Sequence, residues 1–275
     1  MATSNAHESP GDLAVFIERT SAEIAADYAK APANFLKNSS PPEMIELRDG
    51  GRIVLHSAMP AWSKVIGWGL SGPVSEEEIA EVELQFMDRG FTPRAWLTPF
   101  HNREFARNLG RRGWHIADWQ QMMGRPLTPD DAAWQAPPGI EIREAEDPDE
   151  WARLITEGFG DELGHTPSQE YIIHRGFAEL PYVRCYTAFH EGKRAGAASL
   201  MLRKGFVNII AASVLPEFRR RGVHHALISH RLKVAAGEGE TLATYSCDPG
   251  SASQRNAERM GFSVLYSRAT MAKEG

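Results

Sequence analysis

The chain has 275 residues, of which 42% are hydrophobic and 24% are charged, and its formal net charge is −6. This composition is typical of a globular protein with one large domain or two small ones. The acidic balance disfavours a nucleic-acid-binding protein, and two cysteines, Cys185 and Cys247, make neither a disulfide framework nor a Cys-rich zinc site.

The sequence shows neither a membrane-spanning segment nor a signal peptide. No apolar run approaches the length of a membrane span, and residues 1–12 are polar and lack a signal-peptide core. We therefore expect a cytoplasmic protein that does not bind membranes.

The first half of the chain alternates helical and strand-like segments. Apolar spacing predicts a first helix over 13–28, and the turn Asp49-Gly50-Gly51 predicts a hairpin. Ser75 and Glu78 form a capping box that begins a helix. The remaining predictions are a hairpin over 44–47 and 52–57, a strand within 62–69, a helix over 76–89, a strand over 93–99, a helix over 102–109, a strand over 114–127 and a proline-rich linker over 130–138.

The second half repeats this alternation with an additional run of strands. The predicted elements are a strand over 139–143, helices over 148–158 and 168–180, strands over 182–190, 196–202 and 206–215, a helix over 223–236, a strand over 241–247, a helix over 251–260 and a strand over 262–271.

The two halves share an element order. Helix, strand, helix and strand over 76–127 parallel the same series over 223–271, and residues 108–114 resemble residues 256–262 in local sequence. A period this long indicates two copies of one domain. We expect a degenerate N-terminal domain at 1–135 and a ligand-binding domain at 139–275.

A cationic turn separates the strand over 206–215 from the next helix. Pro216 stops the apolar run, three arginines and Gly222 follow, and a helical pattern begins at Val223. The first N–H groups of a helix lack partners within it and carry partial positive charge. Such a turn is suited to a phosphate or pyrophosphate. In the first half, residues 69–74 stand at this place without an arginine.

The run Leu-Pro-Glu-Phe-Arg-Arg-Arg-Gly-Val-His resembles the coenzyme A-binding signature of the GNAT superfamily, the acetyl-CoA-dependent N-acyltransferases. Arg219 and Gly222 match the family pattern, whereas His224 stands where Gly or Ala is usual. The resemblance covers 139–275 well and 13–128 weakly. It implies a mixed α/β fold in two tandem copies, with the strands over 206–215 and 241–247 splayed apart to admit the pantetheine arm of acetyl-CoA.

The resemblance also assigns coenzyme-binding residues. Val214 and Leu215 would offer backbone groups to pantetheine and the acyl carbonyl, while Ser253 and Asn256 on the following helix would face the coenzyme. The residues expected to offer N–H groups to the pyrophosphate are Arg219, Arg220, Arg221, Gly222, Val223 and His224. No metal is expected.

The catalytic groups are less defined, because the tyrosine that protonates the leaving thiolate in many members is Ala257 here. Tyr245 or Tyr266, or a water molecule, is the alternative donor. The base candidates are Glu157, Asp161, Glu162, His165 and His190. We select Glu157 and Tyr245 as the catalytic pair.

The expected function is transfer of an acetyl group from acetyl-CoA to a primary amine of a small molecule, by a monomer or homodimer. The missing tyrosine and His224 motivate a first alternative, a non-catalytic sensor or regulatory module that binds acyl-CoA. A second alternative is an acyltransferase that modifies proteins.

Overall fold

The computed structural model describes residues 9–31, 36, 40–160 and 166–274. Its helices are α1 (Pro10–Lys30), α2 (Glu76–Met87), α3 (Arg103–Arg111), α4 (Pro129–Ala133), α5 (Pro148–Phe159), α6 (Pro167–Phe177), α7 (Val223–Gly237) and α8 (Ala252–Arg259), with 3-10 turns η1 (Pro60–Trp62) and η2 (Pro216–Phe218). Its strands are β1 (Glu43–Glu46), β2 (Arg52–Leu55), β3 (Lys64–Ile66), β4 (Arg94–Leu97), β5 (His115–Pro126), β6 (Ile140–Glu144), β7 (Val183–His190), β8 (Lys193–Arg203), β9 (Phe206–Asn208), β10 (Ala212–Val214), β11 (Leu242–Cys247) and β12 (Ser263–Ala272).

In the described residues, the strands form one mixed sheet in the order β1-β2-β3-β4-β12-β5-β11-β9-β8-β7-β6, with β10 paired to β8 beside this path. The predicted mixed α/β fold is confirmed. The element order expected for 139–275 is also confirmed, from β6 through α5, α6 and the antiparallel strands to α7, β11, α8 and β12.

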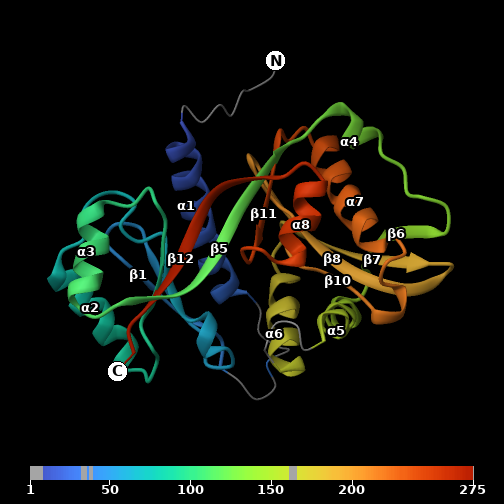
Figure 1. The fold of residues 1–275 in the computed structure, drawn as a ribbon. Coiled ribbons are helices and arrows are strands. Elements are labelled where there is room, and N and C mark those ends of the chain that lie inside the picture. The colour runs from blue at the N-terminus through green and yellow to red at the C-terminus, as the bar shows by residue number, and fades with distance from the viewer. Residues whose placement is uncertain (1–8, 32–35, 37–39, 161–165, 275) are drawn as a thin grey trace.

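The last strand of each half lies within the other half's part of the sheet. β12 pairs antiparallel with β4, and β5 pairs antiparallel with β11. The two strands also pair with each other over most of their length and run side by side through the centre of the molecule (Figure 1). The halves are therefore joined by exchanged strands rather than by a linker alone.

Helices cover both faces of the sheet. On one face α2 and α3 bury a core that includes Phe86, Phe105 and Trp114, and α7 and α8 bury a second core against β11. On the opposite face α1 packs near β2, β3 and β12, and α5 packs on β8 and β10. The capping box predicted for α2 is present, because the Ser75 hydroxyl accepts from the Glu78 N–H and the Ser75 N–H donates to the Glu78 carboxylate.

Two sequence predictions are corrected. The strand expected over 206–215 is interrupted, because residues 209–211 leave the ladder between β9 and β10. The linker expected over 130–138 begins as helix α4, capped by Thr128 and Asp131. The predicted domain limits, 1–135 and 139–275, stay a prediction.

Candidate functional site

β9 and β11 part after a short parallel pairing. Their register holds at two positions, Val207 with Ala243 and Asn208 with Thr244, and the Ile209 N–H still donates to the Thr244 carbonyl at 3.0 Å. Beyond this point β10 pairs with β8, whereas β11 continues to Cys247 alongside β5. The predicted parting of these strands is confirmed.

A buried arginine on α7 occupies the bend that parts the strands. Arg231 is fully buried, and its guanidinium donates to the carbonyls of Ser199 at 3.0 Å and Ile210 at 2.8 Å. The bend itself places Ala211 at a φ of 36°, which is uncommon for a residue other than glycine. Burial lowers the pKa of Arg231 to about 10, so the side chain remains charged at neutral pH. Arg231 thus supplies donors to carbonyls that the bend removes from the ladder.

Sequence reasoning missed Arg231. It lies four residues after Leu227 and three after Ile228, on the side of α7 that faces the core. A charged residue at an apolar helical position was the available signal.

The backbone of Val214 is directed into the opening. The Ser199 N–H donates to the Ala211 carbonyl at 3.0 Å, and the Leu215 N–H donates to the Ala195 carbonyl at 2.9 Å. Because hydrogen-bonding direction alternates along a strand, the Val214 N–H and C=O point away from β8. The Val214 carbonyl accepts from Arg219 Nε at 3.2 Å, which agrees with this direction. The N–H of Val214 is therefore available on the side where the strands part.

The cationic turn after β10 presents a series of backbone donors. Arg220 and Gly222 have positive φ values of 60° and 81°, and Gly222 is the N-cap of α7 without a side-chain cap bond. None of the backbone N–H groups of residues 220–225 donates to another group in the described chain. A Cβ on Gly222 would meet its nearest neighbour, Ile140 Cδ1, at 3.7 Å, so the backbone is accessible there.

The side chains of the turn have different placements. Arg219 donates to the carbonyls of Val214 and Gly158 and so joins the turn to β10 and α5. Arg220 is exposed, and Arg221 lies over the Phe218 ring at 5.9 Å. His224 is half-buried, and burial with the nearby Arg231 lowers its pKa to about 4, so its imidazole is neutral at pH 7.

Tyr245 and Ser253 meet beside the opening. The two hydroxyls are hydrogen-bonded, and the Tyr245 ring lies 5.8 Å from that of Phe262. Burial raises the pKa of Tyr245, so the phenol keeps its proton at neutral pH. Ala257, where the family usually has tyrosine, is buried in the same core. Asn256 is half-buried and accepts from Arg259 Nη1 at 2.9 Å.

The base candidates are not brought together. Glu157 lies on the exposed side of α5, next to Gly158, and His190 at the end of β7 has its ring 5.9 Å from Phe218. Tyr266 is on the α1 face, where its buried hydroxyl donates to Glu18 at 2.7 Å. Asp161, Glu162 and His165 lie outside the described residues.

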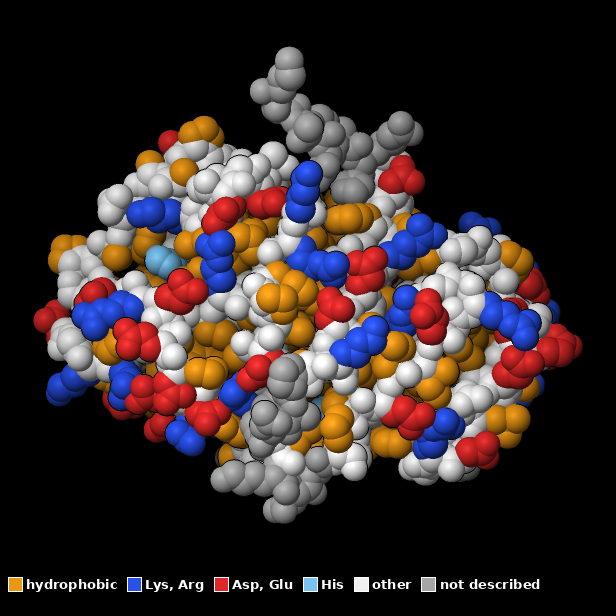
Figure 2. All heavy atoms as spheres, turned by 180° about the vertical axis from the view of Figure 1, so that it is seen from behind, with side chains coloured by type: hydrophobic (Ala, Val, Ile, Leu, Met, Phe, Trp, Pro, Cys, Tyr) orange, Lys and Arg blue, Asp and Glu red, His pale blue; other side chains and the backbone are white. Residues whose placement is uncertain are grey.

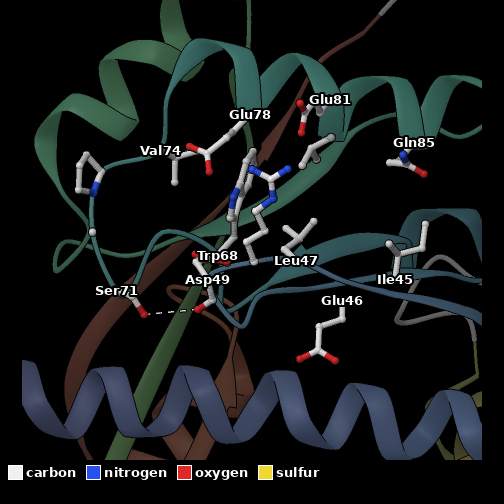
Figure 3. A pocket seen from close by; sticks show the side chains of 14 residues that line it. Ile45, Glu46, Leu47, Asp49, Trp68, Ser71, Val74, Glu78, Glu81 and Gln85 are labelled. Carbon is white, nitrogen blue, oxygen red and sulfur yellow. Dashed lines mark hydrogen bonds between the residues drawn. The ribbon is translucent and has the colours of Figure 1, made fainter.

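The equivalent turn of the first half has the opposite charge. Three glutamates, Glu76, Glu77 and Glu78, occupy the first turn of α2. A pocket of about 370 Å³ lies beside it, and Figure 3 shows Glu78 and Glu81 projecting from α2 toward the pocket that Trp68 also lines. Carboxylates at this position repel a diphosphate. Of these two turns, the one before α7 has the charge expected of a diphosphate site.

The surface carries mixed charge. Lys and Arg side chains are interspersed with Asp and Glu side chains over the face seen in Figure 2. Among the described helices, none is long and apolar enough to cross a bilayer.

Comparison with known proteins identifies a match in the second half. Residues 148–262 match the model of the acetyltransferase (GNAT) family. This range contains α5 to α8, the cationic turn and both parted strands. No curated protein sequence matches the chain significantly.

Solved structures resemble almost the whole chain. A GCN5-related N-acetyltransferase from Kribbella flavida has a TM-score of 0.62 at 17% identity, covering 92% of this chain and 96% of its own. A tandem GNAT protein from the clavulanic acid biosynthesis pathway has a TM-score of 0.60 at 15% identity, covering 98% and 95%. A GCN5-related N-acetyltransferase from Sphaerobacter thermophilus has a TM-score of 0.57 at 15% identity, covering 97% and 93%. At these identities the likeness concerns the fold, including its tandem arrangement.

Proposed function

Because residues 148–262 belong to the acetyltransferase (GNAT) family, we propose that the protein moves an acetyl group from acetyl-CoA to a primary amine of a small molecule. The observation that supports this most strongly is the opening between β10 and β11, which leads toward a turn whose residues 220–225 have N–H groups without a partner in the described chain. Backbone donors at a helix N-terminus suit a diphosphate, and unpaired strand edges suit the amides of pantetheine.

The coenzyme contacts follow from the placement of the backbone. The N–H groups of residues 220–224 hold the diphosphate, and the Val214 carbonyl at the edge of β10 accepts from a pantetheine amide. Leu215, expected to take part, instead donates its N–H to the Ala195 carbonyl and accepts from the Phe218 N–H. Arg219 acts through its bonds to the Val214 and Gly158 carbonyls, which fix the turn against the strand. His224 is neutral at pH 7 and adds a donor without a charge. Asn256 and Ser253 contact the coenzyme from α8.

The chemistry is direct attack. The neutral amine nitrogen attacks the thioester carbonyl carbon, and the Val214 N–H stabilises the resulting oxyanion. The C–S bond then breaks, and coenzyme A leaves as a thiolate. The phenol of Tyr245, held by Ser253, donates the proton that the thiolate takes up. Glu157, directly or through water, accepts the proton that the amine loses.

Release of free thiol from acetyl-CoA across a panel of small primary amines tests this function. The expected result is thiol release that requires both the amine and the enzyme. Protection of the protein against thermal unfolding by acetyl-CoA, without thiol release for any amine, would instead favour a sensor. Labelled acetyl-CoA whose label appears on protein after incubation with lysate would favour a protein-modifying enzyme.

A further inference from the structure

A cationic cluster lies on the α1 face of the sheet, outside the coenzyme site. Val65, Ala95 and Ala269 face the core under α2 and α3, so their neighbours along each strand face the opposite side. We call this set the Trp96 cluster. Its members are Lys64 of β3, Arg94 and Trp96 of β4, and Arg268 of β12.

Two cations of the cluster, Arg268 and Lys64, lie over one indole ring. The guanidinium carbon of Arg268 lies 3.4 Å from the Trp96 ring centroid, and Lys64 Nζ lies 5.0 Å from it. Arg268 is 3% exposed and forms an ion pair with Glu18 of α1 at 3.1 Å. Its Nε is buried without a hydrogen-bond partner.

The positive charge of the cluster exceeds the negative charge near it. Lys64 and Arg94 are half-buried, and neither forms an ion pair or hydrogen bond within the described chain. The nearby carboxylates are Glu18, which pairs with Arg268, and the exposed Asp118 of β5. Placing cations together away from water is costly unless an anion compensates them. The cluster is therefore short of an anion.

The Trp96 cluster lies a few strands from the opening in which the acyl group would sit. β12 is two strands from β11, which borders the opening, and β4 is three strands away. With adjacent strands about 4.8 Å apart, the cluster lies roughly 10–15 Å from the opening. On this face α1 packs near β12 and α5 packs near β10, and α6 packs against α5 and, through Phe177, against Tyr28 of α1.

We propose that the Trp96 cluster binds the anionic group, a carboxylate or a phosphate, of the acyl acceptor. This rests on the proposed acetyl transfer for the identity of the ligand, although anion binding itself does not. The acceptor is thus an amine that carries an anionic group about 10 Å from its nitrogen. Arg94 and Lys64 supply donors to the anion, and Trp96 keeps the Arg268 guanidinium in place.

The pKa of Lys64 can be used to detect anion binding without measuring catalysis. Burial, together with Arg268 and Arg94, lowers the pKa of Lys64 to about 7, while Asp118 opposes this shift. Glu18 faces the same surface from α1 and is paired with Arg268. A bound anion adds negative charge, so it raises the pKa of Lys64 and slows its acylation at neutral pH.

The first experiment measures the rate at which N-hydroxysuccinimidyl acetate modifies Lys64 in the full chain, by peptide mass spectrometry across pH 6 to 10. Succinate and inorganic phosphate are compared with sodium chloride at equal ionic strength. We expect either anion to raise the pH midpoint of Lys64 modification in the wild type and not in Arg94→Met. The control Arg107→Met, on the exposed side of α3, should behave as wild type. A midpoint that neither anion moves would overturn the proposal.

The second experiment measures acetyl transfer to 8-aminooctanoate, glycine and octylamine. We expect Arg94→Met to lower kcat/KM for 8-aminooctanoate roughly tenfold or more relative to octylamine, because a charge-assisted hydrogen bond is lost. An equal loss for both amines would contradict the anion site. Thiol release with octylamine tests the proposed function separately, so the two proposals fail independently.

Discussion

Gly222 is the residue on which the diphosphate site depends most directly. Its φ of 81° places it in the left-handed region, and no atom lies closer than 3.7 Å to the position of a Cβ. Gly239, after α7, has a nearly equal φ of 83° and open space around it. Substituting either glycine costs a similar backbone strain, roughly 1–2 kcal/mol.

We therefore expect Gly222→Glu to abolish the protection that acetyl-CoA gives against thermal unfolding, because the carboxylate takes the place of the phosphates. Gly239→Glu should unfold at a similar temperature without ligand and retain the protection. Differential scanning fluorimetry with and without acetyl-CoA measures both. Equal protection of the two variants would refute the placement of the diphosphate.

Tyr245 is the residue on which thiolate protonation depends. Tyr245→Phe keeps the buried ring and removes the proton donor, so kcat should fall by about 10²–10⁴ with little change in KM for acetyl-CoA. Tyr182→Phe, which removes a phenol bonded to Asp27, is the matched control and should retain kcat. Thiol-release kinetics measure both variants. An undiminished kcat in Tyr245→Phe would assign the proton to water.

Much of the coenzyme site is readable from residue types. Pro216, the arginines and Gly222 predicted a strand end, a cationic turn and a helix start, and the structure places all three there. The bond between Tyr245 and Ser253 was not predictable, because it depends on how α8 packs against β11. The direction of Arg219 toward two carbonyls, rather than into solvent, likewise follows from tertiary packing.

At the scale of elements, the bend between β9 and β10 determines the opening. The sequence predicted one strand over 206–215, because the run Ile209-Ile210-Ala211-Ala212 has no breaker residue. The interruption is stabilised from outside the segment, by Arg231 of α7. A local pattern does not contain that contact.

Arg231→Met should destabilise the fold and close or disorder the opening. The substitution leaves buried carbonyls without donors, which costs on the order of 3 kcal/mol. Hydrogen exchange of residues 209–215 and 245–247 should change, and acetyl-CoA should bind more weakly, whereas Arg231→Lys should recover part of both. Exchange and binding that match wild type in Arg231→Met would show that the bend forms without this side chain.

At the scale of the whole molecule, the exchanged strands make the halves interdependent. The sequence predicted the repeat but not the exchange of strands between the halves. β5 and β12 occupy corresponding places in the repeat, so the local pattern does not tell which of them pairs with β4. Which strand lies beside β4 is decided by packing across both halves. The polar bonds of Arg268 to Gln120 and Glu18 are part of that packing.

We expect residues 139–275 expressed alone to aggregate or self-associate, because β5 is then missing from between β11 and β12. Co-expression with residues 1–135 should restore a soluble complex that acetyl-CoA protects. Size-exclusion chromatography and thermal unfolding measure both. A monomeric, cooperatively folded 139–275 fragment with full acetyl-CoA protection would contradict this interdependence.

Histidines that are buried or half-buried make stability depend on pH. Burial is the main cause that lowers the pKa of His56, His224 and His230 to about 4 from an ordinary value of 6.5. The unfolded chain thus binds more protons between these values, so the free energy of unfolding should fall as pH falls from 6.5 to 4.5. Urea unfolding at several pH values should show this slope, and a shallower one in His56→Gln. An equal slope in wild type and His56→Gln would show that His56 does not contribute to the pH dependence of stability.

A crystal structure of the full chain with coenzyme A tests most directly whether the turn before α7 binds the diphosphate. We expect the diphosphate to lie against the backbone amides of residues 220–224 and the pantetheine arm to lie along β10, between β10 and β11. Coenzyme A bound in the first half, or a closed ladder from β10 to β11 with the coenzyme elsewhere, would contradict it.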